Sequence, residues 1–283
     1  MSGTFAARET EELAWASWDA VNMPLENLGI RKLEEELRAW FTEGMAEPRS
    51  VVDGLDIGWG GVQRWATSAM PDLGRGLHLD FACGYATFLA QLGWRFPQAG
   101  LVGLNIDFSG VHAAAKPLLR RARVRARLVR GDARRIPFPD GAFESVSCFL
   151  GMQDIELAFG EQALFEVLGE CVRVLRSSGI LCLLDEIAFE CFDALLASSP
   201  LEVETRAERA LDVRWDREAA ECAVELYAQG WLQQRRLRDP SVDGKMASAY
   251  LAKLRKDLEK QFADRGYYVP FGPVRMVVCR KLR

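Results

Sequence analysis

The sequence predicts an α/β protein with a doubly wound, mostly parallel sheet. Apolar runs of strand length alternate with runs of helix length between residues 76 and 189. The strand-like runs are almost continuously apolar, which is typical of parallel strands that helices cover on both faces. A turn of small residues, DFACGYA, follows the first of these runs. Open sheets of this kind bind their ligands at such a turn, so the fold class also indicates where the site lies.

The residues before the sheet are predicted to form an N-terminal helical segment, 1–70. Residues 8–45 carry apolar side chains at the 3.6-residue period of an amphipathic helix. Residues 48–61 are rich in turn formers and are expected to form a loop. A short helix that ends before Pro71 completes the segment.

Five strands and their helices follow in order and make up a core at 71–189. The predicted strands are residues 76–82, 99–107, 124–133, 143–152 and 180–189. The predicted helices between them are residues 86–96, 109–122 and 161–179. Because crossovers between parallel strands are right-handed, the doubly wound arrangement is the simplest one that fits.

Residues 190–265 interrupt the alternation. They are mostly helical in pattern and too long for an ordinary crossover, so we expect a helical cap over the C-terminal edge of the sheet. Two short β-patterned runs follow, GYYVPF and VRMVVCRKLR, joined through Gly272 and Pro273. So close a connection favours an antiparallel hairpin at 266–283, which would bring the sheet to seven strands.

Composition narrows the functional classes. The formal net charge of -4 gives no general attraction to nucleic acid, and no apolar run reaches the ~20 residues of a membrane span. The seven cysteines form no CxxC pair, and only two histidines are present. We therefore predict a cytoplasmic protein with reduced cysteines, no structural metal, no nucleic-acid partner and no membrane span. The N-terminal helices could pack on their own chain or form a homodimer.

The turn from Asp80 to Ala86 indicates a ligand that is cationic at one end and lacks phosphate. Gly84 lets the backbone approach a ligand closely, and the helix that follows presents free N–H groups. The spacing is not GxGxxG, and no Gly-Lys-Ser/Thr follows as a phosphate-binding loop would require. The Asp80 carboxylate would repel a diphosphate but would suit an amine.

Five segments, in order, resemble the class I S-adenosylmethionine-dependent methyltransferase family of the small-molecule type. DFACGYA resembles motif I, D/E-x-G-x-G-x-G, and VGLNID resembles the end of the second strand. VRGDARRIPFPDGAFESVSC and LGECVRVLRSSGILCLLDE resemble the family's third-to-fourth-strand and fifth-strand segments. The terminal GYYV and VRMVVCRK resemble its final hairpin. The resemblance covers Leu77 to Phe189 and the last 18 residues, and it implies a Rossmann-like fold with S-adenosyl-L-methionine as cofactor.

The resemblance assigns cofactor-binding roles position by position. Asp80 and the backbone of Ala82, Cys83 and Gly84 would hold the methionine end. Asn105 would stand where the family usually has an acidic residue that binds both ribose hydroxyls.

The adenine end of the cofactor is assigned in the same way. Asp132 would accept from the adenine amino group, Ala133 would supply a backbone N–H, and Ile106 and Leu150 would enclose the ring. Trp59, in the loop DIGWGG, is a candidate for a cation–π contact with the sulfonium.

The sequence departs from the family pattern at three of these positions, and simpler roles stay open. Ala82 and Ala86 replace glycines, and Asn105 replaces a carboxylate with the loss of one acceptor. Asp80 and Gly84 could belong to an ordinary strand–helix turn. Asp132 could be only a helix N-cap, and Asn105 only a turn residue.

Two residues are candidates for catalysis. Glu186, at the end of the fifth strand, could act as a general base or could be a supporting, solvated carboxylate. Gln153, with Asp154 beside it, could position a substrate. We expect His112 on a helix surface and Trp94 in the core.

Nine cationic residues lie close together in sequence and favour a solvated basic face over a site for an anionic substrate. They are Lys116, Arg120, Arg121, Arg123, Arg125, Arg127, Arg130, Arg134 and Arg135.

The function predicted from these features is methyl transfer to an oxygen or carbon of a hydrophobic small molecule, with natural-product biosynthesis as one setting for it. Apolar residues of the insertion could line its chamber or could be core: Phe189, Phe192, Leu195, Leu196, Trp215, Ala219, Leu226 and Trp231. Two alternatives are an enzyme that binds the same cofactor but catalyses cyclisation or isomerisation, and a non-catalytic binding protein.

Overall fold

The computed structural model describes residues 60–283 except for 109–111, 114, 211–213 and 270–271. The chain divides into two compact units. With those gaps left out, the described residues of the sheet unit fall within 60–156, 161–210 and 269–283, and those of the helical unit are 157–160 and 214–268. The predicted N-terminal helices and the Trp59 loop lie outside the described residues, apart from the last helix of that segment.

One seven-stranded sheet, in the order β3-β2-β1-β4-β5-β7-β6, forms the sheet unit. Its parallel strands are β1 (Leu77–Phe81), β2 (Gly100–Asn105), β3 (Ala126–Arg130), β4 (Phe143–Phe149) and β5 (Leu175–Asp185). Its antiparallel strands are β6 (Leu201–Arg209) and β7 (Val274–Lys281). The strand order reverses between β1 and β4, which confirms the doubly wound α/β fold and defines the switch point.

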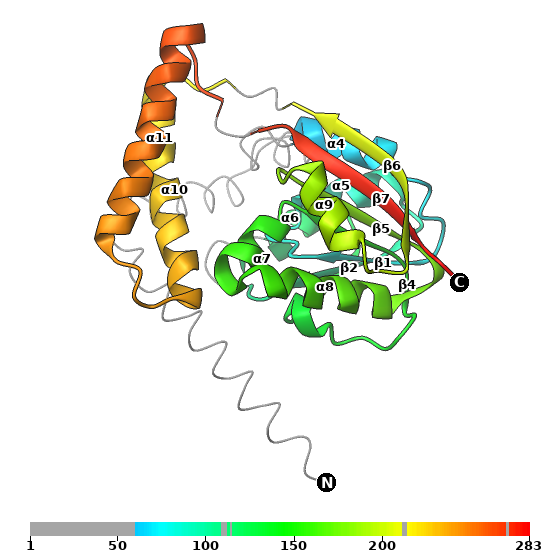
Figure 1. The fold of residues 1–283 in the computed structure, drawn as a ribbon. Coiled ribbons are helices and arrows are strands. Elements are labelled where there is room, and N and C mark those ends of the chain that lie inside the picture. The colour runs from blue at the N-terminus through cyan, green and yellow to red at the C-terminus, as the bar shows by residue number, and fades with distance from the viewer. Residues whose placement is uncertain (1–59, 109–111, 114, 211–213, 270–271) are drawn as a thin grey trace. The chain divides into compact units, whose positions relative to one another are not determined.

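Helices cover both faces of this sheet (Figure 1). On one face lie α4 (Gly60–Ala69), α5 (Thr87–Arg95) and α6 (Ala115–Arg121). On the other lie α8 (Glu161–Val174) and α9 (Phe189–Leu196), and α7 (Met152–Phe159) follows β4 directly. The apolar runs of the strands are therefore buried from both sides, as the sequence pattern predicts.

Side chains of β1 alternate between the two faces of the sheet. Leu79 and Phe81 pack in the main apolar core with the buried side of α8. His78 and Asp80 point to the opposite face, because neighbouring residues of a strand project in opposite directions. All four side chains are fully buried. The strand thus carries two polar groups in an otherwise apolar layer, which is costly unless they find partners.

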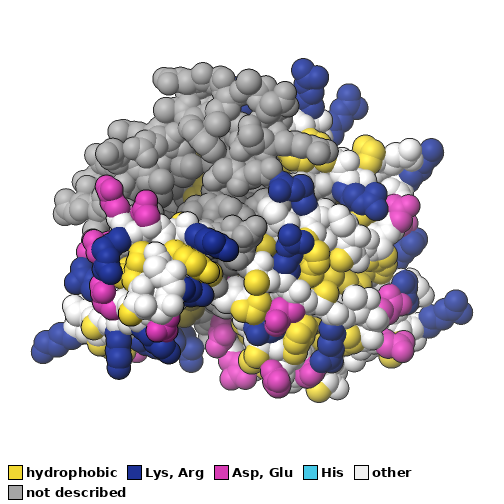
Figure 2. All heavy atoms as spheres, turned by 90° about the horizontal axis from the view of Figure 1, so that it is seen from above, with side chains coloured by type: hydrophobic (Ala, Val, Ile, Leu, Met, Phe, Trp, Pro, Cys, Tyr) yellow, Lys and Arg dark blue, Asp and Glu magenta, His cyan; other side chains and the backbone are white. Residues whose placement is uncertain are grey.

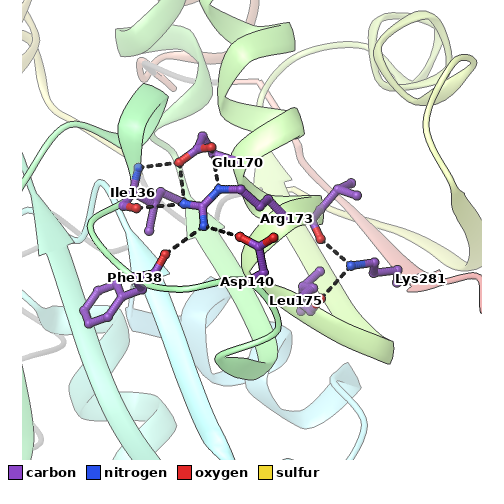
Figure 3. A network of polar contacts seen from close by, with 8 residues as sticks. Ile136, Phe138, Asp140, Glu170, Arg173, Leu175 and Lys281 are labelled. Atoms are coloured by element: carbon purple, nitrogen blue, oxygen red, sulfur yellow. Dashed lines mark hydrogen bonds and ion pairs between the residues drawn. The ribbon is translucent and has the colours of Figure 1, made fainter. Parts of the chain in front are cut away.

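An ion-paired cluster ties α8 to the loop that follows β3 (Figure 3). Arg173 donates from Nη2 to the Ile136 carbonyl at 2.9 Å and from Nη1 to the Phe138 carbonyl at 2.8 Å. Its Nη1 also lies 2.9 Å from Asp140 Oδ1. Glu170 accepts from the Ile136 backbone N–H at 2.7 Å, and its contact with Arg173 lowers the pKa of the Glu170 carboxyl. The cluster fixes residues 136–140, immediately after the predicted adenine-binding segment.

The helix α8 ends earlier than the predicted helix, which extended to residue 179. It ends at Val174, and Leu175 already pairs with Phe143 as the first residue of β5. Lys281 of β7 donates to the carbonyls of Val172 and Leu175, each at 2.6 Å (Figure 3). The bonds satisfy carbonyl groups that the end of a helix leaves without partners.

The predicted partner of the last strand is wrong. β7 pairs with β5 and with β6. Strand β6 lies in the segment that was predicted to be a helical insertion. Tyr268 of GYYVPF, the run predicted to pair with the last strand, instead forms an isolated bridge with Trp215. Glu208 of β6 forms an ion pair with Arg275 at 2.7 Å directly opposite on β7. The antiparallel pair of C-terminal strands therefore exists, but a long insertion separates its two strands.

Residues 190–213 consequently belong to the sheet unit rather than to the insertion. Phe192, Leu195 and Leu196 of α9 pack in the core of the sheet, which settles their alternative roles in favour of core packing. The helical unit begins at 214 and contains α10 (Arg217–Arg238) and α11 (Gly244–Arg265).

The helices α10 and α11 pack against each other in antiparallel fashion. Arg217 forms an ion pair with Glu259 at 2.6 Å, and Trp231 stacks on Tyr250 with ring centroids 5.0 Å apart. Trp215 packs against a small buried cluster of this unit. The side chains of Ala219 and Leu226 lie outside the described residues, so their predicted role in a substrate chamber stays a prediction.

Charged side chains of both signs surround small apolar areas on the face shown in Figure 2. The predicted basic cluster lies on α6, on β3 and in the segments beside them. Six of the nine side chains, those of Lys116, Arg120, Arg123, Arg125, Arg127 and Arg135, are exposed and have no ion-pair partner among the described residues. Within the described residues, no helix is both long enough and apolar enough to cross a bilayer.

Candidate functional site

The carboxyl ends of β1 and β4 meet at the switch point of the sheet. The turn after β1 touches the turn after β4 so closely that a Cβ atom on Gly151 would lie 2.5 Å from the Cβ of Ala82. Only glycine fits at position 151. The close approach brings the motif-I segment beside Leu150 and Gln153, which the sequence also assigned to the site.

The turn after β1 adopts a backbone that usually requires glycine. Ala82 has φ of 52°, Gly84 of 47° and Ala86 of 65°, and Leu150 in the facing turn has φ of 58°. Left-handed backbone costs a non-glycine residue about 1 kcal/mol or more. The two alanines thus keep the glycine-type geometry of the family motif at an energetic cost, and such strain clusters at functional sites.

Helix α5 starts inside this turn with Ala86 at its N-cap position. An alanine side chain cannot accept from the first N–H groups of the helix, so these donors stay available to a ligand. Gln63 of α4 donates from Nε2 to Thr87 Oγ1 at 2.9 Å, which fixes the first residue of the helix. Cys83 donates its backbone N–H to the Leu104 carbonyl at 3.1 Å and ties the turn to β2.

The Asp80 carboxyl is buried beneath the turn. Ser147 Oγ donates to Asp80 Oδ1 at 2.7 Å, whereas Oδ2 has no hydrogen-bond donor among the described residues. Burial raises the pKa of Asp80 to about 7, and the hydrogen bond from Ser147 opposes that rise. A buried acceptor without a donor is unfavourable, and a cationic or N–H-bearing ligand would supply the missing donor.

A second polar group lies at the end of β2. Asn105 is buried, donates from Nδ2 to the Asp107 carbonyl, and lies 3.2 Å from His112 Nδ1. The His112 ring contacts Tyr85 edge to face, and a Cβ on Gly84 would lie 3.9 Å from its Nε2. Burial lowers the pKa of His112, although the charge of Asp107 opposes this.

His112 therefore belongs to the site, and its expected place on a helix surface is wrong. The sequence did not reveal this because the contact joins Asn105 to a residue seven positions further along the chain, which no local pattern predicts. Asn105 occupies the end of β2, as the resemblance implied, and its Nδ2 bond to the Asp107 carbonyl is also one that a turn residue makes. Its contact with the ribose hydroxyls stays a prediction.

The adenine end of the predicted site follows β3. Asp132 is the N-cap of a short 3₁₀ helix, η3 (Ala133–Arg135), and accepts from the Arg134 N–H at 2.8 Å. The Arg134 side chain also forms an ion pair with Asp132 at 2.6 Å. Asp132 is thus a helix N-cap, which is one of the two roles considered for it from the sequence. Its contact with adenine stays a prediction. Ala133, in the same turn, is partly buried against the core.

The residues predicted to enclose the adenine ring come from two different strands. Ile106 follows β2 and is partly buried, and its carbonyl accepts weakly from Arg130 Nε at 3.4 Å. Leu150 follows β4, is also partly buried, and donates its backbone N–H to the Leu184 carbonyl at 2.8 Å. Both lie at the carboxyl edge, which is where the resemblance requires them.

The two predicted catalytic residues are connected through Asp185, which the sequence reasoning did not assign to the site. Asp185 Oδ2 accepts from the backbone N–H of Met152 at 2.9 Å and of Gln153 at 3.4 Å. Its Oδ1 accepts from the Glu186 N–H at 2.8 Å. Asp185 therefore joins the start of α7 to the end of β5. The signal for it in the sequence is an acidic residue at the end of a strand that is otherwise mostly apolar.

Glu186 has the environment of a group that can exchange a proton near neutral pH. Burial, and then the charge of Asp185, raise the pKa of Glu186 to about 8, although Arg275 opposes the rise. Its Oε1 is buried without a hydrogen-bond partner among the described residues. Arg275 donates to the Glu186 carbonyl at 3.0 Å and holds the backbone in place.

Residues 79–183 match the family described as a methyltransferase domain. This segment runs from within β1 to within β5 and contains the turns that follow β1 and β4. It is a class I S-adenosylmethionine-dependent methyltransferase domain. The sequence resemblance and the doubly wound fold are therefore confirmed for the core of the methyltransferase domain.

Curated relatives of the domain carry a common name. The demethylmenaquinone methyltransferase of Deinococcus radiodurans is 33% identical over 137 residues, which are 47% of this chain and 51% of that protein. Two further relatives of the same name match at similar levels. The chain thus spans about half the length of the curated relatives that it matches.

Solved structures share the fold of the methyltransferase domain at low identity. The geranyl diphosphate C-methyltransferase of Streptomyces coelicolor is 11% identical with a TM-score of 0.50, over 85% of this chain and 86% of that one. The cyclase SpnF is 15% identical with a TM-score of 0.50, over 78% and 80%. Because both enzymes share the architecture, the fold alone does not decide the reaction.

Proposed function

We propose that this protein transfers a methyl group from S-adenosyl-L-methionine to an oxygen or carbon of a hydrophobic small molecule. The observation that carries the proposal is the turn from Asp80 to Ala86. It combines left-handed backbone, a helix start with free N–H groups and a buried carboxyl with an unmatched oxygen. This combination lies at the switch point of a methyltransferase domain.

The residues present fit the two ends of the cofactor. Asp80 offers Oδ2 to the methionine ammonium, directly or through one water, and the buried setting strengthens that attraction. Asn105 would accept from a ribose hydroxyl through Oδ1, since its Nδ2 already has partners. Asp132 and Ala133 would meet the adenine amino edge, between Ile106 and Leu150. When bound, the cofactor supplies a methyl group on a sulfonium that is already activated for displacement.

The protein would contribute alignment and proton removal. A hydroxyl or an acidic carbon must lose its proton as it accepts a methyl group, and Glu186 would take that proton. The pKa of about 8 at Glu186 makes the ionised form a stronger base than an exposed glutamate. Gln153, held beside it through Asp185, would orient the acceptor.

A quinone, reduced to its quinol, is the first acceptor class to test. The relatives named demethylmenaquinone methyltransferase support this choice. A quinol is aromatic and hydrophobic, and it carries an acidic hydroxyl beside a nucleophilic ring carbon, as the proposed base requires. A role in natural-product biosynthesis, a homodimer and a cytoplasmic location stay predictions of the sequence.

The test is methyl transfer from S-adenosyl-L-methionine labelled in its methyl group to a short-chain demethylmenaquinol. We expect a labelled product and an equal amount of S-adenosylhomocysteine, with both formed about 10²- to 10⁴-fold more slowly by the Glu186→Gln variant. Conversion of the acceptor without S-adenosylhomocysteine would instead favour cyclisation or isomerisation. Failure of S-adenosylhomocysteine to bind or to stabilise the protein at millimolar concentration would overturn the cofactor assignment.

A further inference from the structure

A row of four polar side chains crosses from β4 to β1 beneath the motif-I turn. The row runs Ser145, His78, Ser147 and Asp80, alternating between the two strands. The pairing of the strands places His78 opposite Ser145 and Asp80 opposite Ser147. All four residues are buried, with exposed fractions of 3% for Ser145 and 0% for the others.

Each member of the row bonds the next. His78 Nδ1 lies 2.8 Å from Ser145 Oγ, and His78 Nε2 lies 2.9 Å from Ser147 Oγ. Ser147 Oγ lies 2.7 Å from Asp80 Oδ1. These are ordinary hydrogen-bond lengths, so the row is continuous from one end to the other.

The chemistry of the end group sets the direction of every bond. An ionised Asp80 can only accept, so Ser147 must donate its hydroxyl hydrogen to Oδ1. Ser147 then accepts from His78, whose ring hydrogen must be on Nε2, and His78 Nδ1 accepts from Ser145. Burial lowers the pKa of His78 to about 3, which keeps the ring neutral with the single hydrogen that this arrangement requires.

The effect of the row falls on Asp80, the group at its end. A buried histidine and three buried hydroxyl or carboxyl groups cost more than apolar residues of the same size would. Such a row holds one carboxylate oxygen with a donor and leaves the other, Oδ2, without one among the described residues.

Resting on the function proposed above, we propose that Ser145, His78 and Ser147 are positioning residues that hold Asp80 ionised and oriented for the cofactor's ammonium group. They act through Asp80 and touch no reacting atom. His78 fixes the Ser147 hydroxyl, and Ser147 stabilises the negative charge on Asp80.

Among the described residues, three thiols have a pKa that responds to the charge of Asp80. Cys83 in the turn, Cys148 on β4 and Cys182 on β5 each interact with its charge, and burial raises the pKa of all three thiols well above the neutral range. They therefore stay uncharged where Asp80 titrates. The α-amino group of the cofactor loses its charge only near pH ~8.

The experiment measures the pH at which Asp80 ionises by two independent methods. Aspartate-labelled protein without ligand gives the titration midpoint of Asp80 by carbon NMR, assigned with Asp80→Asn. Calorimetry with S-adenosylhomocysteine from about pH 5 to about pH 8 gives the pH dependence of binding. In the unaltered protein we expect the affinity to rise with pH as Asp80, with its pKa of about 7, ionises.

Ser147→Ala removes the one donor to Asp80 found among the described residues, so we expect both midpoints to move upward by about one pH unit, with about tenfold weaker binding at neutral pH. His78→Leu should move them in the same direction but less, because Ser147 remains. Ser147→Thr keeps the hydroxyl and should restore the original midpoint. Val146→Ala is the matched control: it removes buried atoms from the opposite face of β4 and should lower Tm without moving either midpoint.

An unchanged Asp80 midpoint in Ser147→Ala, with an unchanged pH profile of binding, overturns the positioning role. A shift shared equally by Val146→Ala also overturns it, since the effect would then follow stability alone. Absence of S-adenosylhomocysteine binding at every pH in the unaltered protein rejects the proposed function instead. In that case the NMR midpoints still decide whether the row controls Asp80.

Discussion

Asp80 and Asp185 occupy corresponding places at the carboxyl ends of β1 and β5, and burial raises the pKa of each to about 7. Their surroundings differ in the number of donors. Asp185 accepts from three backbone N–H groups, two at the start of α7 and one at Glu186. Asp80 accepts from one serine hydroxyl and keeps an unmatched oxygen.

The same pKa thus accompanies two different roles. Asp185 is saturated by backbone donors and connects two elements of the fold. Asp80 keeps an oxygen, Oδ2, that no donor among the described residues reaches. A perturbed pKa indicates a functional candidate, but the donors around the group decide whether it serves the fold or a ligand.

Loss of the proposed base, Glu186 at the end of β5, should have a larger effect than any other change considered. Glu186→Gln should lower kcat by about 10²- to 10⁴-fold, because the proposed base is lost, with little change in the affinity for S-adenosylhomocysteine. In the unaltered enzyme kcat should rise as pH approaches about 8, since the raised pKa of Glu186 keeps it protonated below that value. Steady-state rates across pH test both points.

The exposed Glu190→Gln, in the first turn of α9, is the matched control for that change. It should leave kcat and its pH profile unaltered. Equal loss of activity in both variants would argue against a specific role for Glu186.

The next effect concerns the unmatched acid on the β1 side. Asp80→Asn should weaken S-adenosylhomocysteine binding by about 10- to 100-fold, because the ammonium loses a buried negative partner. The folded-state pKa of Asp80 is raised, so its stabilising contribution is present at acid pH and is lost as pH rises from 3.8 to about 7. The variant should therefore gain stability relative to the unaltered protein at alkaline pH, by about 4 kcal/mol at most.

Denaturant unfolding at about pH 5 and about pH 8 measures that gain. A variant that is destabilised equally at both values would show that Asp80 supports the fold as Asp185 does. The contrast between the two acids would then disappear.

Replacing the saturated acid, Asp185, should instead lower stability. Asp185→Ala leaves three backbone N–H groups without an acceptor and should lower the free energy of unfolding by about 3 kcal/mol. Asp185→Asn keeps one accepting oxygen and should lose less. Thermal and denaturant unfolding check the order, and a loss of cofactor affinity without a loss of stability would contradict the assigned role.

The smallest effect concerns backbone strain in the cofactor turn. Ala82→Gly relieves a left-handed φ of 52° and should raise stability by somewhat under ~1 kcal/mol, since glycine also gains freedom in the unfolded chain. Ala90→Gly, inside α5, should instead destabilise by about 1 kcal/mol. If both substitutions destabilise alike, the turn stores no strain.

Much of the fold could be predicted because its signals are local. The continuous apolar strands, the small-residue turn and the amphipathic α8 each depend on neighbours in sequence. Strand β6 could not be predicted, because LEVETRAER is highly charged and only its first residue is fully buried. Its identity depends on pairing with β7 and on cross-strand ion pairs such as Glu208–Arg275. Charge on an edge strand also protects it from pairing with other chains.

The candidate site was predictable to the same degree. Asp80, Gly84, Asn105 and Glu186 lie at strand ends, so alternation and order locate them. His112 and Asp185 were missed because their roles depend on which backbone and side-chain groups surround them in three dimensions. The row through His78 could not be predicted from the sequence either, since it depends on the register between β1 and β4.

A crystal structure of the protein with S-adenosylhomocysteine would test whether the turn from Asp80 to Ala86 binds the cofactor. We predict that the amino group of the ligand lies at Asp80, directly or through one water, and that its ribose lies at Asn105. Its adenine should lie between Ile106 and Leu150. A ligand bound elsewhere, or a diphosphate-bearing molecule held over Gly84 in its place, would show that the turn is not a site for S-adenosyl-L-methionine.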